Sequence, residues 1–395
     1  MADLYFSRGV TVYLQQGTNV WQIPVLAGYS FSQSTNTSEI SLNEMTDTSG
    51  NSRRGKQVFT DSLSPAEWSF DMYMRPYMGT ADGQVDGTTP LTHCVEEAIW
   101  ANFVSVGDFT PGETTTAADW DSIGVVLANQ ATGSSFNFTA SNKAALGTFT
   151  LYFVFDGAVV SSVYKIEGCV VGGIGVTFDL EGIATLNVSG SGGVVQDITE
   201  GTDGLDNAPT ATITEGIADT DNFIRNRLTS LAVQSVNDSV YGLSAGWTLF
   251  PGSGSGAYTI VITGGSINFE NNISFLTPET LGIVNTPLEH VTGGRSVSGN
   301  FTCYLARDAT GGSAADFIND LNKDTTRSLV SNQFALTFSV GGSADPKVVI
   351  AMPKCHVSVP NITIEDVISM DVAFSALPTD LSSADEATIT YHAPA

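Results

Sequence analysis

An internal repeat restricts the possible folds of this chain more than any other feature of its sequence. Residues 164–190 match residues 349–376 at an offset of 186, which pairs Cys169 with Cys355 and needs no gap. Apolar residues fall at the same alternate positions in both segments, and a slip of one residue would turn a strand inside out. The match therefore predicts the same strands in both segments.

Two further stretches recur in the same order in both halves of the chain. Residues 67–75 match residues 298–306 at an offset of 231, and residues 149–155 match residues 334–340 at an offset of 185. Because the order is conserved between the halves, we predict a duplicated domain.

The two expected domains span residues 1–190 and 212–395. Residues 191–211 between them are rich in Gly and Asp, which is the composition of a linker. The offset falls from 231 to 186, so the first copy carries about 45 extra residues. We expect them as a surface insertion within residues 79–145.

Each copy is predicted to be mainly β, a β-sandwich or half-barrel with one packed α-helix. Trp68, Phe70 and Met72 alternate with polar residues, and residues 370–375 alternate in the same way. A period of two indicates a strand with one buried face and one polar face. The Gly content, 40 of 395 residues, also favours strands and turns over long helices.

One helix is expected in each copy. Thr89 and Pro90 are predicted to open the first, because Pro favours the first helical position, and apolar residues within 91–99 form its buried stripe. In the second copy, residues 313–316 have the S-x-x-D spacing of a helix cap. Apolar residues within 317–321 follow it.

The charge balance excludes several classes of protein. The 41 acidic residues against 15 Lys and Arg give a net charge of −26, so we expect neither a grip on nucleic acid nor docking on anionic lipid. No signal segment opens the sequence and no apolar run reaches about 18 residues, so no membrane contact is expected. The four widely spaced cysteines are expected to be buried free thiols.

No cofactor, metal ion or catalytic role is predicted. Residues 242–246 have the G-x-S-x-G spacing of a hydrolase nucleophile, but the Gly- and Pro-containing sequence after them cannot form the required helix. The acids within 82–86 and 203–206 could chelate calcium weakly, although solvated turns are the simpler interpretation. Cys355 and His356 are adjacent, so on a strand their side chains point to opposite faces rather than to one zinc ion.

Residues 61–77, DSLSPAEWSFDMYMRPY, resemble a stretch of the phage major tail tube proteins. The resemblance implies a sandwich-plus-helix fold, six tube domains that close a ring, and rings that stack into the hollow tail of a virion. Some long-tailed siphophages fuse two tube domains in one chain, so that three chains form a pseudo-sixfold ring, and the duplication here is similar. The second copy lacks the Trp and the Arg-Pro of this motif.

The resemblance also implies partners for the chain. These are further copies of itself, and the tape measure, baseplate or tail-tip and tail terminator proteins, with viral DNA only in transit. An acidic channel suits that role because it repels phosphates, whereas a basic channel would bind them. The acids expected to face the channel, opposite the core, are Glu67, Asp71, Asp179, Glu181, Glu365 and Asp371. The alternative for each is an exposed acid on the outer surface.

Two long polar loops at matched positions, residues 34–56 and 277–294, are candidates for contacts between stacked rings. Basic side chains in these loops, or directly after the second one, could dock on an acidic edge of the next ring. The basic residues concerned are Arg53, Arg54, Lys56 and Arg295. The alternative is a pair of loops without a partner.

Two other functions stay open from the sequence alone. An adhesin or carbohydrate-binding β protein would show a cluster of exposed aromatic residues and a discrete ligand. A glycosidase-like enzyme would need an acid with a strongly raised pKa in a cleft, and no pair stands out among the 41 acids. The copies share alternating strands but almost no polar identities, which favours a ring-forming protein over a repeated ligand site.

Overall fold

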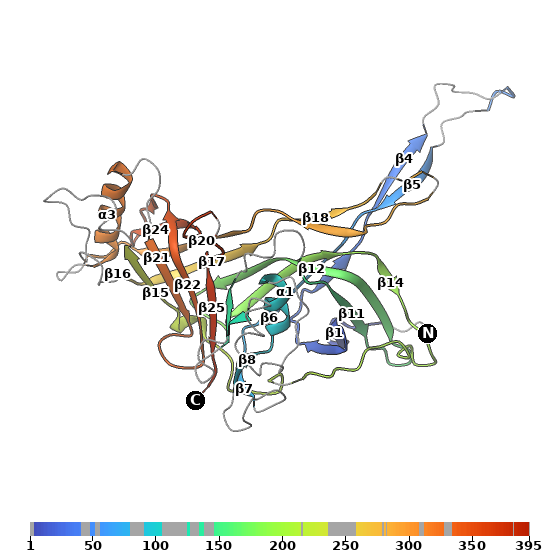
Figure 1. Cartoon of the computed structure of the whole chain (residues 1–395), viewed down its shortest axis with the longest axis horizontal. Helices are drawn as coiled ribbons and strands as arrows, with labels where there is room; N and C mark the ends of the chain where they lie inside the picture. Colours follow the sequence, from blue (N-terminus) through green and yellow to red (C-terminus); the bar gives the residue numbers. More distant parts are fainter. Residues whose placement is uncertain are drawn as a thin grey trace.

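The computed structural model confirms a mainly β fold, with one 19-stranded sheet and three two-stranded sheets among the described residues (Figure 1). Within the same part of the chain, no helix is both long and apolar enough to cross a membrane. The structure describes residues 4–40, 48–51, 56–79, 91–104, 125–126, 134–137, 146–214, 216–235, 258–278, 280–281, 283–307, 312–327, 334–381 and 383–394.

The described elements follow the chain in two series. The first half holds η1 (Ser7–Gly9), β1 (Val10–Gln16), β2 (Asn19–Ile23), β3 (Ser30–Ser32), β4 (Thr35–Ile40), β5 (Gln57–Leu63), β6 (Ala66–Tyr73), β7 (Pro76–Gly79), β8 (Leu91–Cys94), α1 (Glu97–Val104), β9 (Val125–Val126), β10 (Ser134–Asn137), β11 (Phe149–Phe155), β12 (Ser162–Phe178), β13 (Thr185–Gly192) and β14 (Val195–Asp197). The second half holds η2 (Asn226–Leu228), β15 (Ser230–Ser235), β16 (Tyr258–Ile260), β17 (Ile262–Glu270), β18 (Ile273–Leu276), β19 (Glu289–Thr292), β20 (Ser296–Tyr304), α3 (Ala314–Arg327), β21 (Phe334–Val340), β22 (Lys347–Val357), β23 (Asn361–Thr363), β24 (Ser369–Ala376) and β25 (Thr388–His392).

The two halves repeat one pattern of antiparallel pairing. In the first half the order runs β2–β1–β11–β12–β13–β6–β3. In the second half β16–β15–β21–β22 leads to β24, β20 and β17 in the same way, with β23 continuing β22. The duplication read from the sequence is therefore a duplication of strand pairing.

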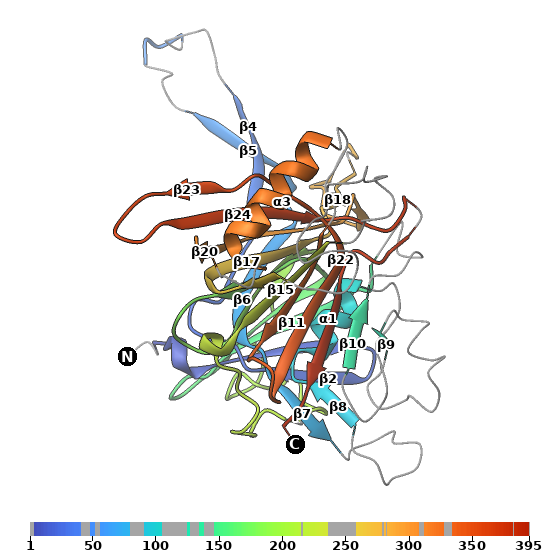
Figure 2. The same cartoon turned by 90° about the vertical axis from the view of Figure 1, so that its left-hand side faces the viewer.

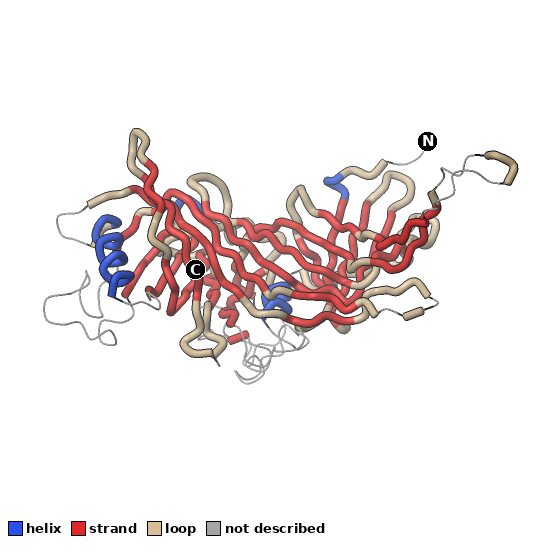
Figure 3. The backbone as a smooth tube through the Cα atoms, turned by 90° about the horizontal axis from the view of Figure 1, so that it is seen from above, coloured by secondary structure: helices blue, strands red, loops and turns tan. Residues whose placement is uncertain are grey.

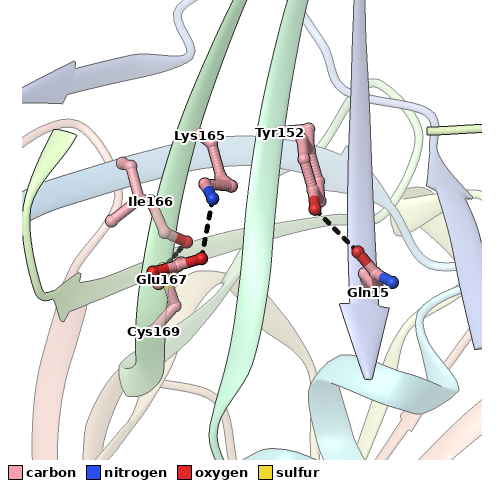
Figure 4. Close-up of polar contacts among 6 residues, drawn as sticks. All are labelled: Gln15, Tyr152, Lys165, Ile166, Glu167 and Cys169. Carbon is pink, nitrogen blue, oxygen red and sulfur yellow. Dashed lines mark hydrogen bonds and ion pairs between the residues drawn. The ribbon is translucent and has the colours of Figure 1, made fainter. Parts of the chain in front are cut away.

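The repeat includes the same irregularity in both halves. Phe149 lies opposite Cys169, and the register then shifts before the next pair, while Phe334 lies opposite Cys355 with the same shift. In Figure 4 the Cys169 thiol donates to the Ile166 carbonyl at 3.3 Å. A β-bulge interrupts the hydrogen bonds between two strands at a specific residue. The shared bulge therefore shows that the two strand pairs are equivalent residue by residue.

One part of the sequence alignment is wrong by two residues. Phe70 pairs with Val188 in the first half, and its equivalent Phe301 pairs with Val372 in the second. The last strand is therefore related by 184 residues rather than 186, because five residues separate the paired Thr363 and Ser369, whereas seven separate the equivalent pair Thr177 and Thr185. A shift of two leaves every side chain on its own face, so alternation could not reveal it.

The expected core positions are confirmed. Trp68, Phe70 and Met72 are buried on β6, and Met370, Val372 and Phe374 on β24. These alternate with half-buried or exposed polar residues on the other face of the sheet. The described cysteines are buried free thiols, as predicted.

The first helix begins later than predicted. Residues 91–94, expected in a helix opened by Pro90, form β8 and pair with β7. Helix α1 begins at Glu97, where the amides of Ile99 and Trp100 donate to the carbonyl of Glu96. The pairing with β7, which the local periodicity does not reveal, decides the structure of these four residues.

The second helix begins as predicted. The Ser313 hydroxyl donates to the Asp316 carboxylate at 2.7 Å, and α3 starts directly after Ser313, at Ala314. Phe317 and Leu321 are buried in the core. The segment expected as a linker, residues 191–211, begins with the end of β13 and contains β14, which pairs with β12.

Candidate assembly interface

The two halves join edge to edge into one sheet. β12 of the first half pairs with β17 of the second, with Val176 opposite Ile267 and Phe178 opposite Gly265. This makes a continuous order of β3–β6–β13–β12–β17–β20–β24–β23. Figure 3 shows strands running side by side across the body of the molecule. Within a single chain, an edge strand of the first copy is therefore paired with an edge strand of the second copy.

An aromatic pair closes the junction on the core side. Phe178 stacks on Phe338 of the second half, with ring centroids 5.3 Å apart and an interplanar angle of 8°. Gly265 opposite it has φ +155°, and a Cβ there would lie 2.4 Å from the Asn300 carbonyl oxygen. A glycine at this position therefore gives the backbone the close approach that the junction needs.

The ends of the continuous sheet are two unpaired edges. Among the described strands, β3 pairs only with β6 and β23 only with β24. Ile362 on β23 is 51% exposed, and Ile364 just after it is 79% exposed. A strand edge with exposed apolar side chains favours pairing with a further strand.

Comparison of the two copies shows which kind of strand could pair with each free edge. β3 occupies the place in the first copy that β17 occupies in the second, and β23 corresponds to the part of β12 that β17 covers. The edge at one end of the chain is thus of the type that pairs with the edge at the other end. Two such edges on one molecule form a head-to-tail interface, which closes into a ring when the rotation fits.

The face of this sheet opposite the core is largely polar on the six strands between β3 and β23. Across it, the Asn187 side-chain amide donates to Asp71 at 2.6 Å, and that of Asn300 donates to Asp371 at 3.0 Å. The described residues that alternate with the core here include no Lys or Arg. On β6, β13, β12, β17, β20 and β24 they are Glu67, Ser69, Asp71, Tyr73, Thr185, Asn187, Ser189, Ser191, Gly173, Gly175, Thr177, Ser266, Asn268, Glu270, Ser296, Ser298, Asn300, Thr302, Tyr304, Asp371, Ala373 and Ser375.

The six acids singled out in the sequence fall into two groups. Three of them, Glu67, Asp71 and Asp371, lie on this polar face. The others lie in the turns at one end of the sheet, Asp179 and Glu181 before β13 and Glu365 before β24. Sequence reasoning missed Glu270, an exposed acid on the same face, although its alternation with the buried Ile267 and Phe269 on β17 could have identified it.

The matched loops form hairpins that project from one end of the molecule. β4 pairs with β5 and β18 with β19, and the β4–β5 hairpin extends away from the body (Figure 2). The two hairpins also touch, since the amide of Leu63 donates to the Asn285 carbonyl at 2.8 Å. Their exposed apolar residues are Ile40, Val58, Phe59, Leu276, Leu281, Ile283, Val284, Leu288 and Val291. We call these two hairpins the arms.

Sequence comparison gives these features a context. No protein-family model matches the chain. The tail tube protein pb6 of Escherichia phage T5 is 29% identical to it over 378 residues, which is 93% of this chain and 70% of that protein. The chain is a relative of a phage tail tube protein. The similarity covers both halves, and it confirms the resemblance carried by residues 61–77 and the virion tail as the expected location.

The four basic residues expected to contact the next ring do not form one patch among the described residues of this chain. Lys56 is ion-paired with Glu39 of its own hairpin at 2.9 Å. Arg295 is largely buried and ion-paired with Glu386 at 3.2 Å, which attaches the start of β20 to the segment before β25. Arg53 and Arg54 lie outside the described residues. Among the described residues, the exposed surface of the arms is therefore more apolar than basic.

The structure describes only some of the residues that the sequence offered for other chemistry. Residues 242–246 and 82–86 lie outside the described residues. In the described part, no three His, Cys, Asp or Glu side chains gather as metal ligands. Asp203 instead accepts a hydrogen bond from the amide of Leu205 at 3.1 Å, which is the geometry of a turn.

Proposed function

We propose that the chain is the structural subunit of a phage tail tube, in which three chains form a pseudo-sixfold ring and rings stack into a channel for viral DNA. The observation that carries the proposal is the β12–β17 junction. Within one chain, the edge of a first copy already pairs with the edge of a second copy. Repeating that contact between chains pairs both ends of the order from β3 to β23 and leaves neither end exposed.

The repeat supports a specific register for the contact between chains. Val176 faces Ile267 within the chain, and the equivalent pair between chains is Ile362 with Phe31. Phe178 faces Gly265 within the chain, and the equivalent pair is Ile364 with Tyr29. A phenylalanine facing a glycine is thus replaced by an isoleucine facing a tyrosine, a bulkier pair that would bury more apolar surface in the contact between chains.

The polar face of the sheet is the proposed channel lining. Three chains at −26 each carry −78 per ring, and the acids proposed to face the channel are Glu67, Asp71, Asp179, Glu181, Glu365 and Asp371, together with Glu270. The remaining residues of the face are mainly Ser, Thr, Asn and Gly. A lining without cations offers DNA phosphates nothing to bind, so the duplex can slide.

In this proposal residues 1–190 and 212–395 are the two tube domains, with 191–211 between them and an insertion within 79–145. The arms contact the next ring, and the ends of the tube meet the tape measure, tail-tip or baseplate and terminator proteins. The exposed apolar residues of the arms support this, because surfaces of that kind usually mark contacts between proteins. The subunit itself performs no catalysis.

The test is negative-stain electron microscopy of the purified protein over a range of concentrations. We expect hollow rings or tubes whose end-on averages have threefold or pseudo-sixfold symmetry. Discrete particles at every concentration that bind a glycan would overturn the proposal in favour of an adhesin.

A further inference from the structure

In the first copy, the segment before β15 covers one end of the sheet. The Ala184 amide donates to the Ile224 carbonyl at 2.8 Å, and the Asn226 amide donates to the Gly182 carbonyl at 3.2 Å. Arg225 forms an isolated antiparallel bridge with Ile183. Residues 223–226 therefore lie across the turn between β12 and β13.

Side chains fix the same segment to β6. The Phe223 ring packs edge-on against Tyr73, with centroids 5.4 Å apart. The Arg75 guanidinium lies over the Phe223 ring, 4.6 Å from its centroid. Since residues 223–226 lead directly into the second copy, a second copy attaches to the first by this segment as well as by its strand edge.

An equivalent segment precedes β1. Val12 pairs with Phe153 and Leu231 with Phe338, which relates the two entry segments by 219 residues, and the short helices η1 and η2 obey the same offset. Residues 4–7 thus correspond to residues 223–226. Leu4 is 77% exposed and Phe6 is 75% exposed. Residues 4–7 are thus equivalent to a segment that packs on a sheet end, but their own apolar side chains are exposed.

The equivalent groove in the second copy is open. It has a volume of about 830 Å³ and is lined in part by Tyr304, Glu365 and Val367, which correspond to Tyr73, Asp179 and Ile183 of the first copy. No described residue of the same chain fills it. In Figure 1 the N-terminal end and β24 lie at opposite ends of the long axis, so the entry segment of a chain is far from its own groove.

We propose that residues 4–7 of one chain dock in this groove of the neighbouring chain. The inference rests on the proposed function, since it needs a second copy and a first copy of two chains side by side. Leu4 then packs on Tyr304, and Phe6 bridges Val367 as Arg225 bridges Ile183. Ala306 stands where Arg75 stands in the first copy, so the cation–aromatic pair Arg75–Phe223 becomes an apolar pair, Ala306–Leu4.

Disulfide trapping with Phe6→Cys and Val367→Cys in one chain tests the contact. The native cysteines are buried, so the background reaction is small. Cross-strand Cβ atoms lie about 4.5–5.5 Å apart, close to what a disulfide needs. We expect covalent multimers in oxidised rings or tubes, at least about tenfold more than either single variant gives.

Two controls calibrate the result. The pair Ile183→Cys and Arg225→Cys reproduces the same bridge inside one chain and should give an intramolecular disulfide even in the unassembled protein. The pair Phe6→Cys and Leu381→Cys uses a residue that lies outside the groove and is more exposed than Val367, and it should give no covalent multimers.

The outcomes separate the docking from the tube itself. Rings or tubes in the microscope without covalent multimers, while the Ile183–Arg225 control is oxidised, would overturn the docking and leave the proposed function intact. Discrete particles at every concentration that bind a glycan would overturn the proposed function, and the docking with it. Multimers specific to the Phe6–Val367 pair would support both.

Discussion

Trp68 lies directly across the β6–β13 pair from Gly190, and a Cβ on Gly190 would come within 2.4 Å of the Trp68 ring. The equivalent pair in the second copy is reversed, with Gly299 facing Phe374, and a Cβ on Gly299 would lie 2.8 Å from that ring. Each copy thus puts one large and one minimal residue at this point, on opposite strands. The packing is preserved although neither residue is, which explains why the tail tube motif fades in the second copy.

Gly190→Ala should destabilise the subunit. The added methyl would also lie 2.1 Å from the Val170 carbonyl oxygen, so the backbone itself must move. We expect a loss of about 1–3 kcal/mol or more in the free energy of unfolding, measured by urea denaturation. The control is Gly294→Ala, where a Cβ meets nothing within 4 Å; equal stability of the two variants would contradict the close approach.

Stability should fall as the pH rises towards neutrality, because of Glu96. Burial raises the pKa of this carboxyl from 4.5 to about 7, so between these values the folded protein holds a proton that the unfolded chain has lost. The free energy of unfolding therefore decreases from about pH 4.5 to pH 7 and then levels off. The total is about 3 kcal/mol at 1.36 kcal/mol per unit.

Glu96→Gln isolates this contribution. The amide cannot ionise, so the variant should lose this slope in chemical denaturation between pH 5 and 8 and should exceed the parent in stability at pH 8. Glu67→Gln, at an exposed acid on β6, is the matched control for the change from a carboxyl to an amide. A Glu96→Gln profile as steep as that of the parent would argue against the buried carboxyl as its cause.

Ile362→Lys should block ring formation without unfolding the subunit. The side chain is 51% exposed in the single chain, so the substitution costs the monomer little, but it puts a charge opposite Phe31 in the proposed contact between chains. Sedimentation should show monomers at concentrations where the parent forms rings. Leu381→Lys, at a fully exposed residue away from either edge, should assemble normally.

The arms should be needed for stacking but not for ring formation. Phe59 is 55% exposed on β5, and Leu281 is fully exposed between β18 and β19. In the double variant Phe59→Ser and Leu281→Ser, electron microscopy should show single rings where the parent shows tubes, because apolar area is lost only from the contact between rings. Tubes of normal length would assign the arms no part in stacking.

Cations on the polar face should make the tube bind DNA. We expect tubes of the variant Asp71→Lys and Glu270→Lys to retain a short DNA duplex at low salt and release it as salt rises, since phosphate contacts depend on counterion release. The parent should not retain it. Asp221→Lys changes the net charge at an exposed residue outside that face, and retention by this variant would point to net charge rather than to the channel.

Several features of the fold could be predicted from the sequence because they depend on local patterns. Neighbouring residues suffice to recognise the alternation in β6 and β24 and the S-x-x-D cap at Ser313. The order of the repeated segments can likewise be read directly along the chain. The start of α1 could not be predicted in this way. Residues 91–94 form a strand because β7 pairs with them, and a pairing partner leaves no trace in the local periodicity.

Residue order alone establishes that the chain is a duplicated β protein with one apolar and one polar side to its strands, since alternation and offset need no knowledge of the fold. The register of the last strand is set only by its pairing in the folded chain, because a two-residue shift preserves every buried face. The same pairing selects which edges are used and which are free. β12 pairs with β17 and leaves β3 and β23 without outer neighbours among the described strands, because hydrogen bonding between strands joins residues that are far apart in the chain.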